Sequence, residues 1–421
     1  MKWLTKTSAM LIIIGLLAGA LAGCGDNSTP QEGHSTLVSA TSMEDVPVLE
    51  YTVPHMQPKI AVDCSGYQSD APKSATLWGK RLPDEYVLVR EEDGAQVYRG
   101  GIEDVTYDEE SGYYIGYADF EEFSTPGEYY LYGSGIGRSL TFSVRDDFYE
   151  TLFRDLYREL VGACHDKSVS LGEINALLTT YEWYGSIYQT DEKEATPEFM
   201  AELVGWFKDM DTTRMDSEET SLYAAVLAKY SYLYQKYDRN YATECLKRAS
   251  AVYEQTQSTL HEDAESFYAV TELYRATGLY TYRKQIQEYK TFFQKSSSYF
   301  EQSGYLYGSM TYMTTRQKVD VELCETFMEN LLARVEELDG CYEEMIHPYR
   351  ARNNGEEALL KRAVEMSFAN YVLDSLQYRA VLEEFLHYLM GRNRDCTSFY
   401  PTKGDRGDYV FLLAQMVNAN N

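Results

Sequence analysis

The sequence predicts a two-part fold, a β-sandwich followed by about twelve helices that pair into a toroid or solenoid. Two observations predict it. Between residues 55 and 145, short runs of alternating apolar and polar residues are bounded by turn signals, which is typical of strands. From Asp146 onward, apolar residues recur at spacings of three and four, which is typical of helices. We therefore expect the sandwich to end and the helices to begin near residue 146.

The first 54 residues contain neither pattern. The chain begins MKWLTKTSAMLIIIGLLAGALAGCG, in which lysines precede an apolar run too short to span a membrane and small residues precede Cys24. This order is typical of a secretory signal, and the ending LAGC resembles the lipobox of bacterial lipoproteins. The resemblance implies a signal peptide at residues 1–23 and a lipid on Cys24. Residues 24–54 are polar and aperiodic, which predicts a flexible tether to the extracellular face of the bacterial cell membrane.

The charge of the chain excludes one large class of partner. The chain has 38 Lys and Arg residues and 66 Asp and Glu residues, which gives a formal net charge of −28. Such a surface repels phosphate backbones, so we expect no nucleic-acid partner, whereas neutral and cationic ligands stay open. The six cysteines after Cys24 include no Cys-x-x-Cys pair, so we predict no metal site or redox cofactor and no particular disulfide. The acidic loops lack EF-hand spacing, which leaves calcium binding undecided.

Five segments make up the predicted sandwich at residues 55–145. In YVLVREEDGAQVYRG, two alternating runs flank Asp93-Gly94, which is a strong local signal for a hairpin. The other runs are KIAVDCSGY, DAPKSATLW, GYYIGYADF and TPGEYYLYGSGIGRSLTFSV. About seven strands within ~90 residues favour two packed sheets.

The segment DDFYETLFRDLYRELVG is representative of the helical part, residues 146–421. Its apolar residues form one stripe and acids occupy its first turn, as helix starts prefer. Helices are predicted to start near residues 146, 172, 197, 217, 240, 263, 280, 305, 319, 356, 375 and 406. Several meet at short breaks such as KYDRNY, so neighbours are expected to form antiparallel hairpins. No fixed repeat of about 34 or 40 residues is present, which disfavours a tetratricopeptide array.

A sandwich that leads through SVRDDFYETLFRDLYREL into a helical domain resembles the family 9 glycoside hydrolases that carry an N-terminal cellulase Ig-like domain. The motifs of the resemblance occur in order: GYQSDAPKSATL, FSTPGEYYL and GRSLTFSV, then TPEFMAELVGWFKDM, AVTELYRATGLYTY and FLHYLMGRN. The resemblance implies an Ig-like sandwich at residues 55–145 and an (α/α)6 barrel at residues 146–421. It also implies inverting hydrolysis of β-1,4-glucans, which needs two carboxyl groups about 6.5–9.5 Å apart.

Both ends of that hydrolytic mechanism look altered here. In the family, a segment resembling ACHD is followed by a Gly-rich Asp-x-x-Asp stretch whose acids activate the water, but here KSVSLGEINALL follows. The family's catalytic Glu lies shortly before the final helix, where this sequence has RDCTSFYPTKGDRGDYVF, without His or Glu. If activity survives, the candidate catalytic residues are Asp166, Asp405 and Asp408. Capping the last helix is the favoured role of the latter two.

The stretch Cys164-His165-Asp166 contains the side-chain types of a catalytic triad or a metal site. Residues at i, i+1 and i+2 do not face one another on a helix, so these three cannot form a triad within one turn. We expect them to form a structural rim, with sugar contact as a less favoured role and catalysis or metal binding as the least favoured.

Tyrosine is abundant, with 39 residues, and most are expected to line helix interfaces with their hydroxyls at the rim. The candidate sugar-binding residues are those expected where helices end, at one mouth of the barrel. They are Trp183, Tyr184, Tyr305, Tyr307, Tyr312, His347, Tyr349, Arg350 and Tyr400. The strongest segment is EEMIHPYRARNNGEE, whose Pro, Asn-Asn-Gly and charged residues predict a long loop.

Three functions fit the sequence. The first is a catalytically degenerate surface relative of family 9 that binds a glycan, such as a β-glucan, or a partner protein. The second is a weak or altered inverting hydrolase, which requires two carboxylates facing one another across a concave site. The third is a scaffold that docks another protein, which a barrel mouth filled by side chains would favour.

Overall fold

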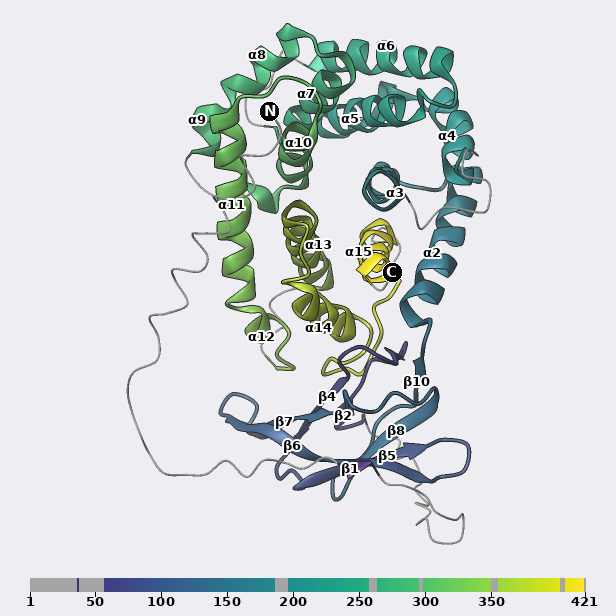
Figure 1. The fold of residues 1–421 in the computed structure, drawn as a ribbon, viewed down its shortest axis with the longest axis vertical. Helices are drawn as coiled ribbons and strands as arrows, with labels where there is room; N and C mark the ends of the chain where they lie inside the picture. The colour runs from purple at the N-terminus through teal and green to yellow at the C-terminus, as the bar shows by residue number, and fades with distance from the viewer. Residues whose placement is uncertain are drawn as a thin grey trace. The chain divides into compact units, whose positions relative to one another are not determined.

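The computed structural model describes residues 36–37, 57–185, 196–256, 263–294, 298–349, 355–401 and 406–419 (Figure 1). The predicted signal peptide and most of the tether lie outside these residues, as do Cys24, Arg350 and Asp405. Within the described part of the chain, no helix combines the length and apolar character needed to cross a membrane. The cysteines of this part are all free thiols.

Strands occupy residues 60–145, as predicted, and form two hydrogen-bonded sheets. One sheet pairs β3 (Tyr67–Gln68), β10 (Phe142–Arg145), β8 (Gly127–Gly133), β5 (Glu85–Arg90) and β6 (Gln96–Asp108) in that order. The other pairs β2 (Ile60–Ala61), β4 (Ser74–Gly79), β7 (Tyr113–Asp119) and again β6, while the short β1 (Thr36–Leu37) and β9 (Gly137–Arg138) add to β6 and β8. The two inner faces bury a common core that includes Leu77, Leu88, Tyr98 and Phe142.

Strand β6 belongs to both sheets because it bends in its middle. Its pairing with β7 shifts register between Glu103 and Thr106, and Asp104 between them has φ 49°, as in a β-bulge. The hairpin predicted at Asp93-Gly94 joins β5 to β6, with Gly94 at φ 68°. A bulge that lets one strand serve two sheets closes this sandwich at its side.

The helical part begins at Phe148, and the described residues hold twelve helices of nine or more residues. These are α2 (Phe148–His165), α3 (Leu171–Tyr184), α4 (Glu198–Asp209), α5 (Ser217–Tyr234), α6 (Arg239–Thr256), α7 (Ala264–Thr277), α8 (Tyr280–Glu288), α10 (Ser303–Thr314), α11 (Val321–Asp339), α13 (Glu356–Leu373), α14 (Arg379–Leu389) and α15 (Arg406–Ala419). Short helices α9 (Lys290–Phe293) and α12 (Tyr342–Met345) follow α8 and α11. The predicted starts lie within four residues of the observed ones.

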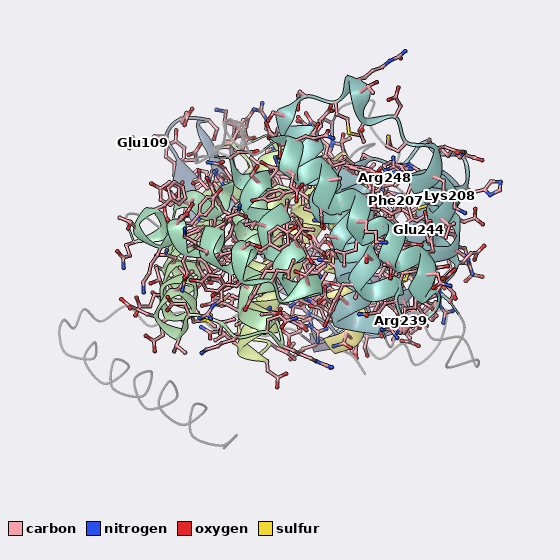
Figure 2. All side chains as sticks on the ribbon, turned by 90° about the horizontal axis from the view of Figure 1, so that it is seen from above. Glu109, Phe207, Lys208, Arg239, Glu244 and Arg248 are labelled. Carbon is pink, nitrogen blue, oxygen red and sulfur yellow. The ribbon has the colours of Figure 1, made fainter. Side chains whose placement is uncertain are left out.

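The helices form an inner and an outer layer, as an (α/α)6 barrel requires. The inner helices α3, α5, α7, α10, α13 and α15 are buried on every face, as in α10, where residues 304–312 are all buried. A helix that is apolar all round belongs in a core. The outer helices are amphipathic, and Figure 2 shows Lys208 on α4 with Arg239 and Glu244 on α6 at the surface, where all three are exposed. The neighbouring Phe207 is buried.

The sandwich packs directly against the helices through buried polar contacts. His387 Nδ1 of α14 lies 2.8 Å from Asp63 Oδ2, and both residues are almost fully buried. Gln68 accepts a hydrogen bond from the backbone N–H of Phe148 at 3.0 Å, which satisfies one free donor at the start of α2. Arg392 hydrogen-bonds to Ser74 of β4 and to Glu384 of α14.

Candidate functional site

The three residues Cys164, His165 and Asp166 lie at the C-terminal end of α2 and do not converge. Cys164 is buried, and burial raises the pKa of its thiol to about 12, so the nucleophilic thiolate is scarce at neutral pH. His165 is exposed and its Nδ1 lies 3.0 Å from Glu202 Oε2 of α4. Asp166 is exposed and forms the C-cap of α2. The geometry provides no nucleophile–base pair in this segment.

The starts of α3 and α15 adjoin, which brings together the two sequence segments where hydrolytic carboxyl groups are expected. Ser170 and Glu173 form a capping box: Ser170 Oγ accepts from the Glu173 N–H at 3.2 Å, and Glu173 Oε2 accepts from the Ser170 N–H at 2.8 Å. The other oxygen, Oε1, accepts from Arg406 Nε at 2.7 Å. Arg406 also binds Glu159 Oε1 at 2.8 Å. Each oxygen of the Glu173 carboxylate therefore accepts from a donor, and the residue is only 2% exposed.

Gly407 allows this close approach of the two helices. A Cβ at Gly407 would lie 2.8 Å from Ala176 Cβ and 2.9 Å from Glu173 Cα, closer than real Cβ contacts. The backbone of α15 thus touches that of α3, and no cleft separates the two helix starts at this point. Asp408, another candidate catalytic residue, lies in the first turn of α15, where an acid was predicted.

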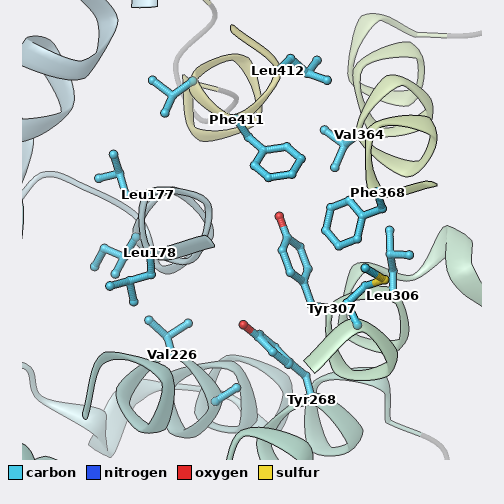
Figure 3. Close-up of a cluster of buried hydrophobic side chains, with 14 of the residues drawn as sticks. Leu177, Leu178, Val226, Tyr268, Leu306, Tyr307, Val364, Phe368, Phe411 and Leu412 are labelled. Atoms are coloured by element: carbon cyan, nitrogen blue, oxygen red, sulfur yellow. The ribbon is translucent and has the colours of Figure 1, made fainter. Parts of the chain in front are cut away.

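The centre of the barrel is filled by side chains from all six inner helices. Figure 3 shows them meeting, among them Leu177, Val226, Tyr268, Tyr307, Phe368 and Phe411. The rings of Tyr307 and Phe368 are 5.0 Å apart, and those of Phe368 and Phe411 are 5.4 Å apart. Burial, with a smaller contribution from the charge of Asp408, raises the pKa of Tyr307 well above its ordinary value. The centre is thus packed as a core.

Four charged side chains meet among the inner helices, of which Lys229, Glu272 and Arg275 are buried and Glu182 is partly buried. Lys229 Nζ donates to Thr179 Oγ1 at 2.7 Å and lies 3.6 Å from Glu182 Oε2 and 3.8 Å from Glu272 Oε1. Arg275 pairs with both carboxylates. Burial alone would raise the pKa of Glu182, but Arg275 and Lys229 outweigh it and lower the pKa. The two carboxylates are bridged by cations instead of facing one another across an open site.

The structure does not bring the predicted sugar-binding residues to one mouth of the barrel, which corrects that prediction. Tyr305 and Tyr312 are buried like Tyr307, and Tyr312 Oη accepts from the Asp320 N–H at 2.8 Å. Tyr349 packs on the sandwich, with its ring 5.8 Å from that of Tyr113. These aromatic rings at helix ends pack against other elements of the fold. The local sequence does not show which elements these are.

Two further candidates also make local contacts. His347 Nδ1 accepts from the Tyr349 N–H at 3.3 Å. The Tyr400 hydroxyl donates to the Leu152 carbonyl at 3.2 Å, and its ring packs edge-on against Tyr409. His347 and Tyr400 are both half-buried.

The remaining candidates, Trp183 and Tyr184, line a pocket of about 490 Å³ at the C-terminal ends of α3, α13 and α15. Its lining residues are Trp183, Tyr184, Asn370, Tyr371, Asp374, Ser375, Leu376, Gln415 and Asn418. The rings of Trp183 and Tyr371 stack at 3.8 Å with an angle of 4° between them. The amide residues of this lining were not predicted, although amides near the ends of otherwise apolar helices, as in SFANYVL and FLLAQMVN, were a visible signal.

Among the described residues, no group of three or more His, Cys, Asp or Glu side chains is placed to hold a metal ion. The lining of the C-terminal pocket includes one carboxylate residue, Asp374. The geometry therefore fits binding through hydrogen bonds and aromatic surface better than metal-assisted or two-carboxylate chemistry at this pocket.

Solved structures of several family 9 proteins have a similar fold. A metagenome-derived glycoside hydrolase family 9 endoglucanase is 17% identical, with a TM-score of 0.67 over 82% of this chain and 85% of its own. A Bacteroides ovatus family 9 protein is 14% identical, with a TM-score of 0.62 over 86% and 99%. A thermostable endoglucanase from Alicyclobacillus acidocaldarius is 15% identical, with a TM-score of 0.61 over 80% and 83%. These likenesses confirm the predicted fold class.

Two family profiles match the sequence itself. The family described as cellulase N-terminal Ig-like domain matches residues 55–138, and glycosyl hydrolase family 9 matches residues 182–406. No match was found among curated proteins. The second profile spans more than half of the chain. The chain therefore belongs to glycosyl hydrolase family 9 and carries an N-terminal cellulase Ig-like domain.

Proposed function

We propose that this chain is a cell-surface member of family 9 that binds a glycan without hydrolysing it. The Glu173–Arg406 pair at the adjoining starts of α3 and α15 carries the proposal. The resemblance puts the water-activating acids before α3 and the catalytic Glu before α15, so in an active relative the two carboxyl groups meet in this region. Here an arginine neutralises the carboxylate, and the helix backbones touch at Gly407.

The requirements of inversion argue in the same direction. An inverting site needs a base, an acid and about 6.5–9.5 Å between them for water and the sugar ring. Each oxygen of Glu173 accepts a hydrogen bond, one from the Ser170 N–H and one from Arg406, and Glu159 is held by the same arginine. Loss of a catalytic group commonly lowers rates by several orders of magnitude.

Proton NMR of the full chain with cellohexaose tests the proposal, in a detergent without a sugar headgroup. We expect saturation transfer to the glycan and no new anomeric signals over a day, while an active family 9 endoglucanase produces α-anomers within the same period. New α-anomeric signals that disappear in Asp405→Asn or Asp408→Asn would contradict the proposal and establish the weak inverting hydrolase instead.

The location is part of the same proposal. The layout of residues 1–24 supports export and lipid attachment at Cys24. In cells grown with labelled palmitate, we expect label in the wild-type chain and none in Cys24→Ala. A chain that is exported without label would leave family membership intact and contradict the lipid anchor.

A protein-docking scaffold is the second candidate, and the packed barrel centre favours it because no open channel is needed for docking. It predicts that no glycan gives saturation transfer. The open pocket at the C-terminal ends of three inner helices favours the glycan-binding proposal over this candidate.

A further inference from the structure

The pocket at the C-terminal ends of α3, α13 and α15 lies at the opposite end of these helices from the Glu173–Arg406 pair. Helix α3 has 14 residues, so its two ends are about 20 Å apart. The helices α3 and α15 adjoin at their starts through Gly407 and again at their ends, where Tyr184 and Gln415 line the same pocket. A ligand here would not touch the place where family 9 hydrolysis is expected.

Three buried polar atoms in the lining of this pocket have no hydrogen-bond partner among the described residues. They are Tyr184 Oη, Asn370 Nδ2 and Gln415 Oε1, on side chains that are 5%, 2% and 6% exposed. An unsatisfied buried polar group is costly, and native structures contain few of them. Three in one pocket, each from a different inner helix, indicate a site that a polar ligand completes.

The chemistry of these atoms defines the ligand. Asn370 Oδ1 accepts from the Tyr378 N–H at 3.1 Å, which assigns the amide so that Nδ2 is the unpartnered donor. Gln415 Oε1 is an acceptor, and the Tyr184 hydroxyl is both. A bare cation would leave Asn370 Nδ2 without an acceptor, whereas a hydroxyl group both donates and accepts. A ligand with several hydroxyl groups satisfies all three atoms.

The electrostatics of the pocket disfavour anionic ligands. The pocket lies at the C-terminal ends of three helices, which carry the negative ends of the helix dipoles. Asp374, in the left-handed conformation at the C-cap of α13, adds a carboxylate to the rim. Sugar acids and sugar phosphates are therefore disfavoured, in agreement with the net charge of −28.

The size and the apolar wall of the pocket fit a sugar ring. Trp183, Tyr184 and Tyr371 form the wall, and such rings pack against the C–H groups of a pyranose. A volume of about 490 Å³ is within the usual range for small-molecule sites. We propose that this pocket binds one neutral pyranose ring of a glycan through Tyr184, Asn370 and Gln415. The assignment rests on the proposed function and gives it a location.

Saturation-transfer NMR of the full chain tests the assignment, in a detergent without a sugar headgroup. The probes are the methyl pyranosides of glucose, galactose, mannose and xylose, with glucuronic acid as the anionic comparison and cellohexaose as the polymer. We expect transfer to at least one methyl pyranoside and none to glucuronic acid. Transfer to glucuronic acid as strong as to methyl glucoside would overturn the neutral-sugar assignment.

Two variants locate the binding. Tyr184→Phe removes only the unpartnered hydroxyl, and Asn370→Asp keeps the acceptor for the Tyr378 N–H while replacing the donor. Each should weaken binding roughly fivefold to tenfold, the usual effect of one hydrogen bond. Tyr223→Phe on α5 is the matched control, because it removes another buried, unpartnered tyrosine hydroxyl away from the pocket and should leave binding unchanged.

The outcomes separate this assignment from the proposed function. Binding that is unchanged in both Tyr184→Phe and Asn370→Asp, or transfer to cellohexaose with none to any pyranoside, overturns the pocket assignment and leaves glycan binding standing. The absence of saturation transfer to every sugar overturns both the pocket assignment and the proposed glycan binding. Tyr184→Phe removes an unsatisfied group, so it should not lower the melting temperature, and a loss of binding cannot then be attributed to unfolding.

Discussion

At the scale of single residues, buried charge sets what the barrel centre can do. Lys229, Arg275, Glu182 and Glu272 form a group with equal numbers of cations and anions. Ions in a low-dielectric interior are stable only when paired and hydrogen-bonded. Burial alone would raise the pKa of Glu182, but Arg275 and Lys229 lower it, and Glu272 is paired with the same two cations. This pairing agrees with a packed, non-hydrolytic centre.

Replacing Lys229 should therefore be costly. Lys229→Met keeps most of the volume but leaves two carboxylates with one arginine, and we expect a loss of about 3–5 kcal/mol in the free energy of unfolding. Urea unfolding measures it. The control is Lys361→Met, which breaks an exposed pair with Glu357 on α13 and should cost less than about 1 kcal/mol. Equal losses in the two variants would contradict the role assigned to the buried group.

Glu265, in the first turn of α7, should make stability depend on pH. Burial, followed by its hydrogen bond and proximity to Asp263, raises its pKa from 4.5 to about 7. A carboxyl group with a raised pKa in the folded state contributes stability that is complete below pH 4.5 and is lost as the pH rises through 7. Glu265→Gln should match the wild type at pH 4.5 and exceed it by about 1 kcal/mol at pH 8, a value reduced for solvent screening. Urea unfolding at the two pH values tests this, and a constant difference would contradict it.

At the scale of helices and strands, most of the fold could be predicted because its signals are local. Ser170, Asp216, Asp263 and Asp320 cap α3, α5, α7 and α11, and each lies within two residues of a predicted start. The largest error was α14, predicted near residue 375 but starting at Arg379. Asp374 has a left-handed backbone conformation at the end of α13, and residues 375–378 connect it to α14. The spacing of apolar residues does not distinguish this connection from a helix.

The candidate site could not be predicted in the same way, because it depends on contacts between distant elements. Glu173 and Arg406 are 233 residues apart and meet only when the ring of inner helices closes. Tyr349 was predicted to lie at a barrel mouth, but its neighbours are Trp78 and Tyr113 of the sandwich. Periodicity indicates that such a ring is partly buried, but not which element buries it.

The contact between α3 and α15 can be tested with one methyl group. Gly407→Ala places a Cβ 2.8 Å from Ala176 Cβ, and we expect a loss of about 1–3 kcal/mol from overpacking. Gly205→Ala in α4 is the matched control, because nothing lies within 4 Å of its Cβ position. There the higher helix propensity of alanine should add about 0.5–1 kcal/mol. A neutral Gly407→Ala, measured by urea unfolding, would mean that a gap separates the two helices after all.

At the scale of the whole described structure, the sandwich and the helices share buried polar contacts. Asp63 and His387 form one of them, and Arg392 with Ser74 and Glu384 forms another. Burial alone would raise the pKa of Glu384, but Arg392 outweighs it and lowers the pKa. Separating the two parts would break the Asp63–His387 and Ser74–Arg392 hydrogen bonds and leave these buried polar groups without their partners. We therefore expect the sandwich and the helical part to unfold in a single transition.

Arg392→Met tests this coupling. The variant leaves Glu384 without its cation at the boundary, so the free energy of unfolding should fall by about 2–4 kcal/mol, since breaking a buried pair strands the remaining charge. Scanning calorimetry should show one peak in the wild type and one peak at lower temperature in the variant. Arg99→Met, which breaks an exposed pair with Glu85 within the sandwich, should leave the peak nearly unmoved. Two separate peaks in the wild type would show that the Ig-like sandwich folds independently, and that the polar contacts at the boundary orient the two parts without coupling their stability.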